Sequence, residues 1–177
     1  SIDYSYDFVA DDGKLTAGKP AQAIEDRIAQ VTQEAYDNGD YIFVAMDRHD
    51  EGDTFHPETK LFPLHNIAGT SGRELYGKLA GVYDAIKDDN RVFWMDKRHY
   101  SAFSGTDLDI RLRERRVTTV VLTGVLTDIC VLHTAIDAYN LGYDIEVVAS
   151  ATASLTPEAH DFAIGHFKNV LGATIVE

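Results

Sequence analysis

The segment Val117–Ala138 reads VTTVVLTGVLTDICVLHTAIDA and joins an apolar run directly to a helical pattern. Its first part, VTTVVL, is a continuous run of β-branched and aliphatic residues, which is typical of a strand buried on both faces. Thr127 or Asp128 could then cap a helix that continues to about Asn140. We therefore expect one strand–turn–helix unit of a parallel sheet that helices cover.

The rest of the chain repeats this alternation. Further apolar runs of strand length are Tyr41–Met46, Val92–Met95, Ile145–Ala149 and Ala173–Val176. Helical spacing of apolar residues marks Pro20–Gly39, Arg73–Asp88, Asp107–Arg115 and a segment that opens at Thr156. Alternating units of this size predict an α/β fold, an open and mostly parallel sheet with helices on both faces. We expect one three-layer α/β/α domain over residues 1–177.

The excess of acidic residues restricts the classes of molecule that the protein is expected to bind. The 29 acidic and 16 basic residues give a formal net charge of -13, so phosphate backbones and anionic lipid surfaces should repel the chain. We expect neither nucleic acid nor a membrane as partner, because no window approaches the roughly 18 apolar residues of a span and no signal pattern opens the sequence. The single cysteine, Cys130, cannot form an intrachain disulfide. A cytoplasmic protein is the expectation.

Polar residues follow several of the apolar runs. Ligands of open α/β sheets bind outside the carboxyl ends of the strands, so these residues are the first candidates for a site. Asp3 lies in a short N-terminal run, and Asp47 directly follows YIFVAM. Asp96 and Lys97 follow RVFWM, and Cys130 comes shortly after TTVVLTG. Two carboxylates, an amine and the sole thiol are therefore expected at one rim.

Cys130 is the most informative of these candidates, because its thiol could act as a nucleophile. A lone cysteine usually packs in the core, but this one lies at a predicted helix start, where free N–H groups favour a thiolate. A surface lysine and a turn-capping aspartate are the ordinary interpretations of Lys97 and Asp3. Beside a thiol, however, they would supply the countercharge and the base that a nucleophile needs. We expect Lys97 and the helix start to lower the pKa of Cys130.

The long irregular segment 47–72 carries a second signal. Asp47 and His49 point the same way if extended, and His56, Glu58 and His65 follow. A solvated polar loop is the ordinary interpretation. Imidazole and carboxylate groups in this density nevertheless indicate a site for zinc, iron or manganese.

Four of these segments together resemble one superfamily. They are IDYSYDF (Ile2–Phe8), MDRH (Met46–His49), FWMDKRHYSAFSGTDLD (Phe93–Asp109) and TGVLTDICVLHTAIDA (Thr123–Ala138). In order and spacing they resemble the cysteine hydrolases that include isochorismatases and nicotinamidases. The Asp/His segment followed by FPLHNIAGTSG is similar to bacterial nicotinamidases in particular.

The resemblance implies catalytic roles. Asp3, Lys97 and Cys130 would be the triad, so Asp7 would not be the catalytic aspartate. A cis peptide bond after Val125 would turn the N–H groups of Leu126 and Cys130 into an oxyanion hole.

The resemblance also implies a metal and a pocket. Asp47, His49 and His65 match the metal ligands, whereas Thr54 stands where many relatives have a histidine. Glu58 is therefore expected as the fourth ligand, with His56 as the second choice, and zinc is expected ahead of iron or manganese. Aromatic walls would come from Phe8, Phe62 and Tyr100.

The implied reaction is hydrolysis of nicotinamide to nicotinate and ammonia through a cysteine thioester, in NAD salvage. A related amidase for a carbamoyl or ureido substrate, a catalytically silent binding protein and a structural metal protein are the alternatives. The metal ligand set argues against the first alternative, and the three reactive residues argue against the second. The superfamily includes monomers and oligomers, so a homo-oligomer stays open.

Overall fold

The computed structural model describes residues 1–177 and has a parallel sheet at its centre. Two strands pair at one side, β1 (Ile42–Asp47) with β2 (Val92–Lys97). Three strands pair at the other side in the order β3 (Thr119–Val125), β4 (Asp144–Ala153) and β5 (Thr174–Val176). All of these pairings are parallel, as the continuous apolar runs predict.

The N-terminal residues join the two groups of strands. Ile2 forms parallel bridges to Ala45 of β1 and to Gly124 of β3. Its N–H donates to the carbonyl of Thr123 at 2.9 Å, and the Asp3 N–H donates to the carbonyl of Ala45 at 3.0 Å. The first residues are thus held in the middle of the sheet, where Asp3 emerges between two buried strands.

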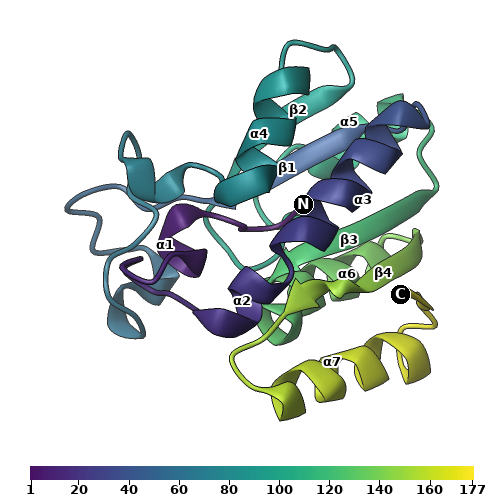
Figure 1. The fold of residues 1–177 in the computed structure, drawn as a ribbon. Coiled ribbons are helices and arrows are strands. Elements are labelled where there is room, and N and C mark those ends of the chain that lie inside the picture. Colours follow the sequence, from purple (N-terminus) through teal and green to yellow (C-terminus); the bar gives the residue numbers. More distant parts are fainter.

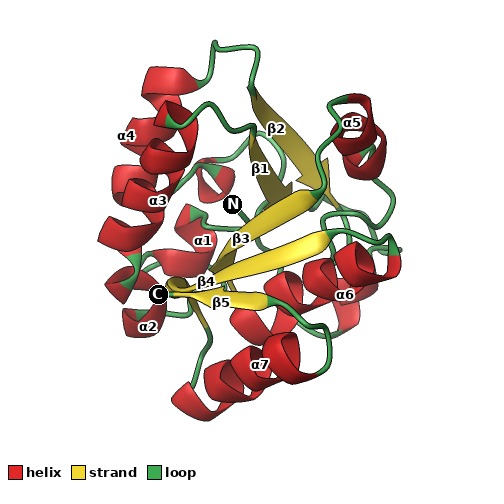
Figure 2. Cartoon of the chain, turned by 90° about the vertical axis from the view of Figure 1, so that its right-hand side faces the viewer, coloured by secondary structure: helices red, strands yellow, loops and turns green.

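Helices cover both faces of the sheet (Figures 1 and 2). One face carries α1 (Tyr6–Val9), α2 (Lys19–Ala23), α3 (Glu25–Asp37) and α4 (Gly77–Ile86), which share a core of 14 buried residues with the sheet. The other carries α5 (Leu108–Glu114), α6 (Leu132–Asn140) and α7 (Pro157–Asn169), around a core of 19 buried residues. The predicted three-layer α/β/α architecture is confirmed.

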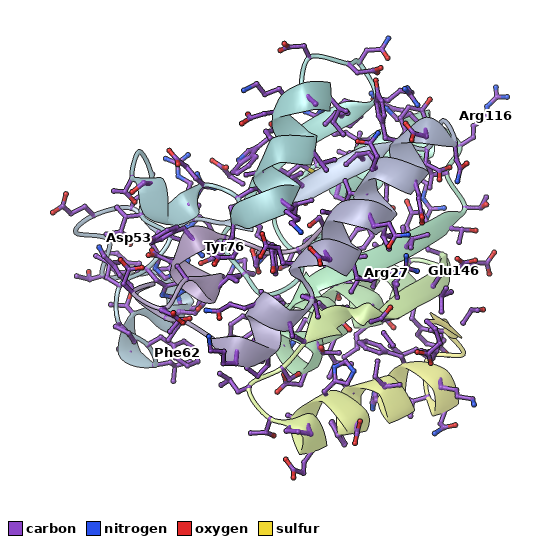
Figure 3. The ribbon with its side chains drawn as sticks, viewed as in Figure 1. Arg27, Asp53, Phe62, Tyr76, Arg116 and Glu146 are labelled. Carbon is purple, nitrogen blue, oxygen red and sulfur yellow. The ribbon has the colours of Figure 1, made fainter.

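The irregular segment 47–72 lies at the carboxyl ends of the strands. It contains only the short 3-10 turn η1 (Pro57–Lys60) and the start of a second, η2 (Ser71–Arg73). Figure 3 shows Asp53 and Phe62 at this end of the molecule, whereas Arg116 and Glu146 lie at the opposite end. Every helix is too short or too polar to span a lipid bilayer.

Three helix boundaries differ from the expectation. The helix predicted from Pro20 is divided at Ile24 into α2 and α3, and the helix predicted from Arg73 begins only at Gly77. A π-helical turn, η3 (Thr127–Val131), precedes α6. Apolar spacing alone does not mark these boundaries.

The predicted caps had mixed outcomes. Neither Thr127 nor Asp128 caps a helix, because Thr127 Oγ1 lies 2.9 Å from His160 Nδ1 and Asp128 accepts a hydrogen bond from Ser154 at 2.6 Å. Both bonds tie η3 to more distant parts of the chain. Thr156 does cap α7, accepting from the Ala159 N–H at 3.2 Å.

Gly124 gives a test of how the N-terminal segment is held. Its φ is +115°, and a β-carbon there would lie 2.0 Å from the carbonyl oxygen of Ile2. Gly124→Ala should therefore lower the free energy of unfolding by about 2–4 kcal/mol in urea denaturation. Gly81→Ala is the control, because no atom lies within 4 Å of the added carbon and helix propensity should raise stability by about 0.5–1 kcal/mol. Equal stability of the Gly124 variant and the parent would contradict the described packing.

Candidate active site

The carboxyl ends of the strands bring three reactive side chains together. Lys97, the last residue of β2, places Nζ 2.7 Å from Asp3 Oδ2 and 3.7 Å from Cys130 Sγ. Its ammonium also donates to the carbonyl of His99 at 3.1 Å. Asp3 is 0%, Lys97 1% and Cys130 8% exposed. The ordinary interpretation of Lys97 as a surface lysine does not hold.

Backbone contacts fix the carboxylate of Asp3. Its φ of +55° lies in the left-handed region, which is uncommon outside glycine but tolerated by aspartate. Its Oδ1 accepts the N–H of Asp47 at 2.7 Å, while Oδ2 faces Lys97. The carboxylate is therefore held between the ammonium and the end of β1, with little freedom to turn away.

Charge and burial set the protonation states. Burial would lower the pKa of Lys97, but the nearby negative groups Asp3, Cys130 and Asp47 raise it above its ordinary value. Burial raises the pKa of Asp3, partly offset by Lys97. Burial also raises the pKa of the Cys130 thiol well above its ordinary value, and Lys97 only partly opposes this. The expectation of a lowered pKa at Cys130 is therefore wrong, because the loss of solvent outweighs the ammonium.

The backbone beside Cys130 has the expected form. The Val125–Leu126 peptide bond is cis. The Leu126 N–H donates to no carbonyl of the protein, while the Leu126 carbonyl accepts from the N–H groups of Ile129 and Val131 at 3.1 and 3.2 Å. Free N–H groups at the start of a helical turn can stabilise a negative oxygen.

A cavity of about 200 Å³ opens in front of the thiol. Phe8, Phe62 and Tyr100, the three aromatic residues expected as walls, all line it, and so do Cys130 and Leu126. Its remaining lining residues are Leu15, Thr16, Ala17, Glu58, Val125, Ile129 and Leu155. Such a mainly apolar lining with a thiol at one side suits a small, flat ligand that carries one polar group.

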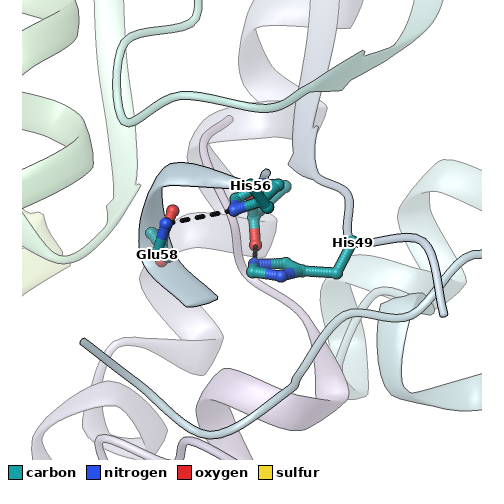
Figure 4. A group of neighbouring side chains, drawn as sticks. His49, His56 and Glu58 are labelled. Carbon is teal, nitrogen blue, oxygen red and sulfur yellow. Dashed lines mark hydrogen bonds and ion pairs between the residues drawn. The ribbon is translucent and has the colours of Figure 1, made fainter. Parts of the chain in front are cut away.

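The candidate metal ligands of segment 47–72 also lie close together. Ligating atoms of Asp47, His49, His56 and Glu58 all lie within 4.8 Å of one another, and all four residues are buried. His65 joins them, with Nε2 3.3 Å from Asp47 Oδ2 and 3.6 Å from Glu58 Oε2. Figure 4 shows His49, His56 and Glu58, and the rings of His49 and His56 stack at 3.8 Å between centroids.

These side chains fit a metal ion. Buried nitrogens of three imidazoles and Asp47 Oδ1 have no hydrogen-bond partner, which is costly for buried polar atoms unless something binds them. Burial and the charge of Asp47 raise the pKa of Glu58 to about 6. A cation would balance the two buried carboxylates of the cluster.

Hydrogen bonds distinguish His65, an expected ligand, from His56, which was expected only as the second choice behind Glu58 for the fourth position. His65 Nδ1 lies 2.7 Å from the carbonyl of Pro63 and can only donate there, which leaves Nε2 with a free lone pair. His56 Nδ1 instead accepts the N–H of Glu58 at 3.3 Å, so Nε2 carries the proton of the neutral ring. The arrangement favours His65 over His56 as a ligand.

Comparison with known proteins assigns the family. The model of the isochorismatase domain matches residues 1–176. The chain belongs to the isochorismatase family. The isochorismatase family protein PncA of Bacillus subtilis (strain 168) is 54% identical over 176 residues, covering 99% of this chain and 96% of that protein.

Solved structures of the isochorismatase family agree closely. The pyrazinamidase/nicotinamidase of Streptococcus mutans UA159 is 80% identical with a TM-score of 0.99, covering 99% of this chain and 97% of its own. The nicotinamidase/pyrazinamidase PncA of Bacillus subtilis is 53% identical with a TM-score of 0.98, covering 99% and 96%. A pyrazinamidase of Pyrococcus horikoshii in complex with zinc is 26% identical with a TM-score of 0.85, covering 99% and 96%.

Some residues of the site were not found by sequence reasoning. Ile129 lines the cavity and directly precedes Cys130, so its position in the sequence could have indicated that it lies near the thiol. Leu15 and Leu155 enter the cavity from distant segments and carry no local mark. Asn66, next to His65, is fully buried and contacts the acidic cluster.

The Lys97–Asp3 pair predicts a strong energetic coupling. Lys97→Met leaves a buried carboxylate unpaired, so it should lower the free energy of unfolding by about 3–5 kcal/mol. The double variant Asp3→Asn/Lys97→Met removes both charges and should lose less than the sum of the single losses, measured by urea denaturation. Lys78→Met, which breaks an exposed pair with Asp26, is the control and should change little. Additive losses from the two buried substitutions would contradict the coupling.

Proposed function

We propose that the protein is a nicotinamidase, which hydrolyses nicotinamide to nicotinate and ammonia in NAD salvage in the cytoplasm. The observation that carries the proposal is the buried Asp3–Lys97–Cys130 group, which opens into an apolar cavity beside a metal-binding cluster. The relatives with nicotinamidase names support the substrate class. One domain over residues 1–177 would contain the whole site.

The first step uses the protonation states of the triad. A neutral thiol and an ionised Asp3 paired with Lys97 would be the resting state. As Cys130 Sγ bonds to the carboxamide carbon, its proton would pass to Asp3, so the nucleophile becomes a thiolate only when it attacks. The N–H groups of Leu126 and Cys130 would donate to the carbonyl oxygen as it becomes negative, and each such donor is typically worth ~10²–10³-fold in rate.

The remaining steps return the proton. Asp3 would donate it to the amide nitrogen, the C–N bond would break, and ammonia would leave a nicotinoyl thioester on Cys130. Asp3 would then remove a proton from the water that attacks the thioester and pass it to the sulfur as the C–S bond breaks. This restores the thiol and the Asp3 carboxylate, and the product leaves as nicotinate once its new carboxyl group has lost a proton to solvent. Lys97 keeps its charge throughout and stabilises the negative groups on either side of it.

The acidic and histidine side chains would hold the metal. Asp47, His49, Glu58 and His65 are the proposed ligands of one divalent cation, with zinc preferred to iron or manganese, and His56 is the alternative fourth ligand. When bound, the cation would act as a Lewis acid toward the pyridine nitrogen of the substrate and thereby orient the ring. The rings of Phe8, Phe62 and Tyr100 would enclose the flat ring of the substrate and thereby limit the accepted amides by shape.

A carbamoyl or ureido amidase is the nearest rival. Such substrates lack an aromatic nitrogen for a metal to contact and would leave the apolar cavity poorly filled. Comparing kcat/KM for nicotinamide and for a carbamoyl amide distinguishes the two functions. A larger value for the carbamoyl substrate would favour the rival.

Removing the thiol gives the most direct mutational test. Cys130→Ala should abolish ammonia release from nicotinamide in a coupled assay, because no thioester can form. The melting temperature should stay close to that of the parent, since a small buried side chain is replaced by a slightly smaller one. Substantial turnover by a folded Cys130→Ala protein would refute covalent catalysis.

Metal removal tests the ligand set. A chelator should remove activity, and zinc, manganese or iron should restore it. His65→Ala should weaken zinc binding more than His56→Ala, because only His65 presents a lone pair toward the cluster in the observed hydrogen bonding. Equilibrium competition with a chromophoric chelator measures both affinities. Full activity in a sample shown to be metal-free by elemental analysis would overturn the proposed role of the cation.

A further inference from the structure

Asn66 lies directly after His65 and is fully buried. Its φ is +45°, in the left-handed region that asparagine adopts more readily than most residues. It does not line the cavity and carries no charge, yet all four of its polar groups have partners. Those partners belong to two separate parts of the chain, residues 5–7 and residues 47–49.

The main chain of Asn66 connects these two parts. Its N–H donates to Asp7 Oδ2 at 2.8 Å. Its carbonyl accepts the N–H of His49 at 3.1 Å, and the next bond, from the Ala68 N–H to the His49 carbonyl at 2.8 Å, extends the same pairing. His49 therefore has its backbone fixed on both sides by the segment that carries Asn66.

The side chain of Asn66 contacts the same two parts. Its Oδ1 accepts the hydroxyl of Ser5 at 2.8 Å, and its Nδ2 donates to Asp47 Oδ2 at 3.5 Å. The oxygen Asp47 Oδ2 is also the one that lies 3.2 Å from His49 Nε2 and 3.3 Å from His65 Nε2. The amide thus touches the atom around which the metal-binding cluster is arranged.

Ser5 carries this connection to the substrate cavity. Besides donating to Asn66, its Oγ accepts the N–H of Phe8 at 3.3 Å and so caps α1. Phe8 lines the cavity, and its ring lies 5.1 Å from the ring of His65. One hydroxyl and one amide therefore join a cavity wall to the acidic cluster.

Asp7, the second acidic residue of IDYSYDF, is buried because its carboxylate accepts backbone hydrogen bonds, and it has no part in the proposed reaction. Its carboxylate accepts the N–H groups of Asn66 at 2.8 Å and Lys14 at 3.3 Å. Gly72 packs against the same carboxylate so closely that a β-carbon there would lie 2.3 Å from Oδ2. Asp7 thus fixes the backbone N–H of Asn66.

We propose that Asn66 is a positioning residue that holds Asp47 and His49 in register with α1, so that metal affinity and alignment of the substrate ring depend on the same amide. This proposal rests on the metal-dependent function proposed above. Fixed donor atoms lose less freedom when a ligand binds, and hydrogen-bond partners behind metal ligands orient them. Loss of the amide should therefore loosen both the cluster and the cavity wall.

Asn66→Gly tests the proposal most sharply. Glycine adopts the left-handed backbone without strain and keeps both main-chain bonds, so the variant removes only the contacts to Ser5 and Asp47. Ser5→Ala is the second variant, because it removes the anchor of the amide while keeping Asn66 itself. Thr32→Val is the matched control, since it removes a buried hydroxyl bond to the Ile28 carbonyl in α3, away from the site.

Three measurements would be made on each full-length protein. Zinc affinity, by chelator competition, should weaken about 10–100-fold in Asn66→Gly, to a smaller extent in Ser5→Ala and not at all in Thr32→Val. The visible absorption of the cobalt(II)-substituted protein should change in the first two variants only. KM for nicotinamide should rise at saturating metal by a larger factor than kcat falls.

Each outcome bears on the proposal. Parental zinc affinity and an unchanged cobalt spectrum in Asn66→Gly would overturn it even if activity fell, and so would a parent that binds no zinc. If Asn66→Gly failed to fold, Ser5→Ala with parental zinc affinity and KM would overturn it instead. A parent that binds zinc but leaves nicotinamide intact would defeat the proposed function, and the zinc and cobalt comparisons would still decide the role of Asn66.

Discussion

The buried ion pair between Lys97 and Asp3 is the constraint on which the site depends. An ammonium that is 1% exposed at the end of a strand costs free energy unless a carboxylate meets it, and Asp3 does so at 2.7 Å. The N-terminal segment is bridged to both β1 and β3, and this position places Asp3 against the last residue of β2. Gly124 has no β-carbon, which lets the carbonyl of Ile2 approach its backbone closely. Asp3 itself has a left-handed backbone conformation at this position.

The same burial decides how the thiol can be used. Lys97 attracts a thiolate, but the loss of water and the carboxylate of Asp3 raise the pKa of Cys130. A neutral thiol next to a paired base favours proton transfer during attack rather than a permanently ionised nucleophile. Two further buried carboxylates, Asp47 and Glu58, add negative charge nearby, which a bound cation would balance. Metal binding and nucleophilic attack would thus be linked through one buried network of charges.

Much of this arrangement could be predicted from the sequence. Continuous apolar runs indicated buried parallel strands, and the polar residue after each run marked the rim where Asp3, Lys97 and Cys130 meet. The π-helical turn and the break at Ile24 leave no mark in the apolar spacing, so they could not be predicted. The raised pKa of Cys130 could not be predicted either, because it depends on burial and on charges from distant segments. The role of Asn66 was hidden for the same reason, since its partners Ser5 and Asp47 lie far from it in sequence.

The central claim is that Cys130 forms a covalent acyl intermediate inside the cavity. Rapid quenching in acid soon after mixing with nicotinamide, followed by intact-protein and peptide mass spectrometry, tests it directly. The account predicts a transient nicotinoyl group on the peptide that contains Cys130, which appears before steady-state nicotinate release and decays when substrate is exhausted. Turnover of nicotinamide with no acyl group on the protein at any time, or with the group on another residue, would contradict the account.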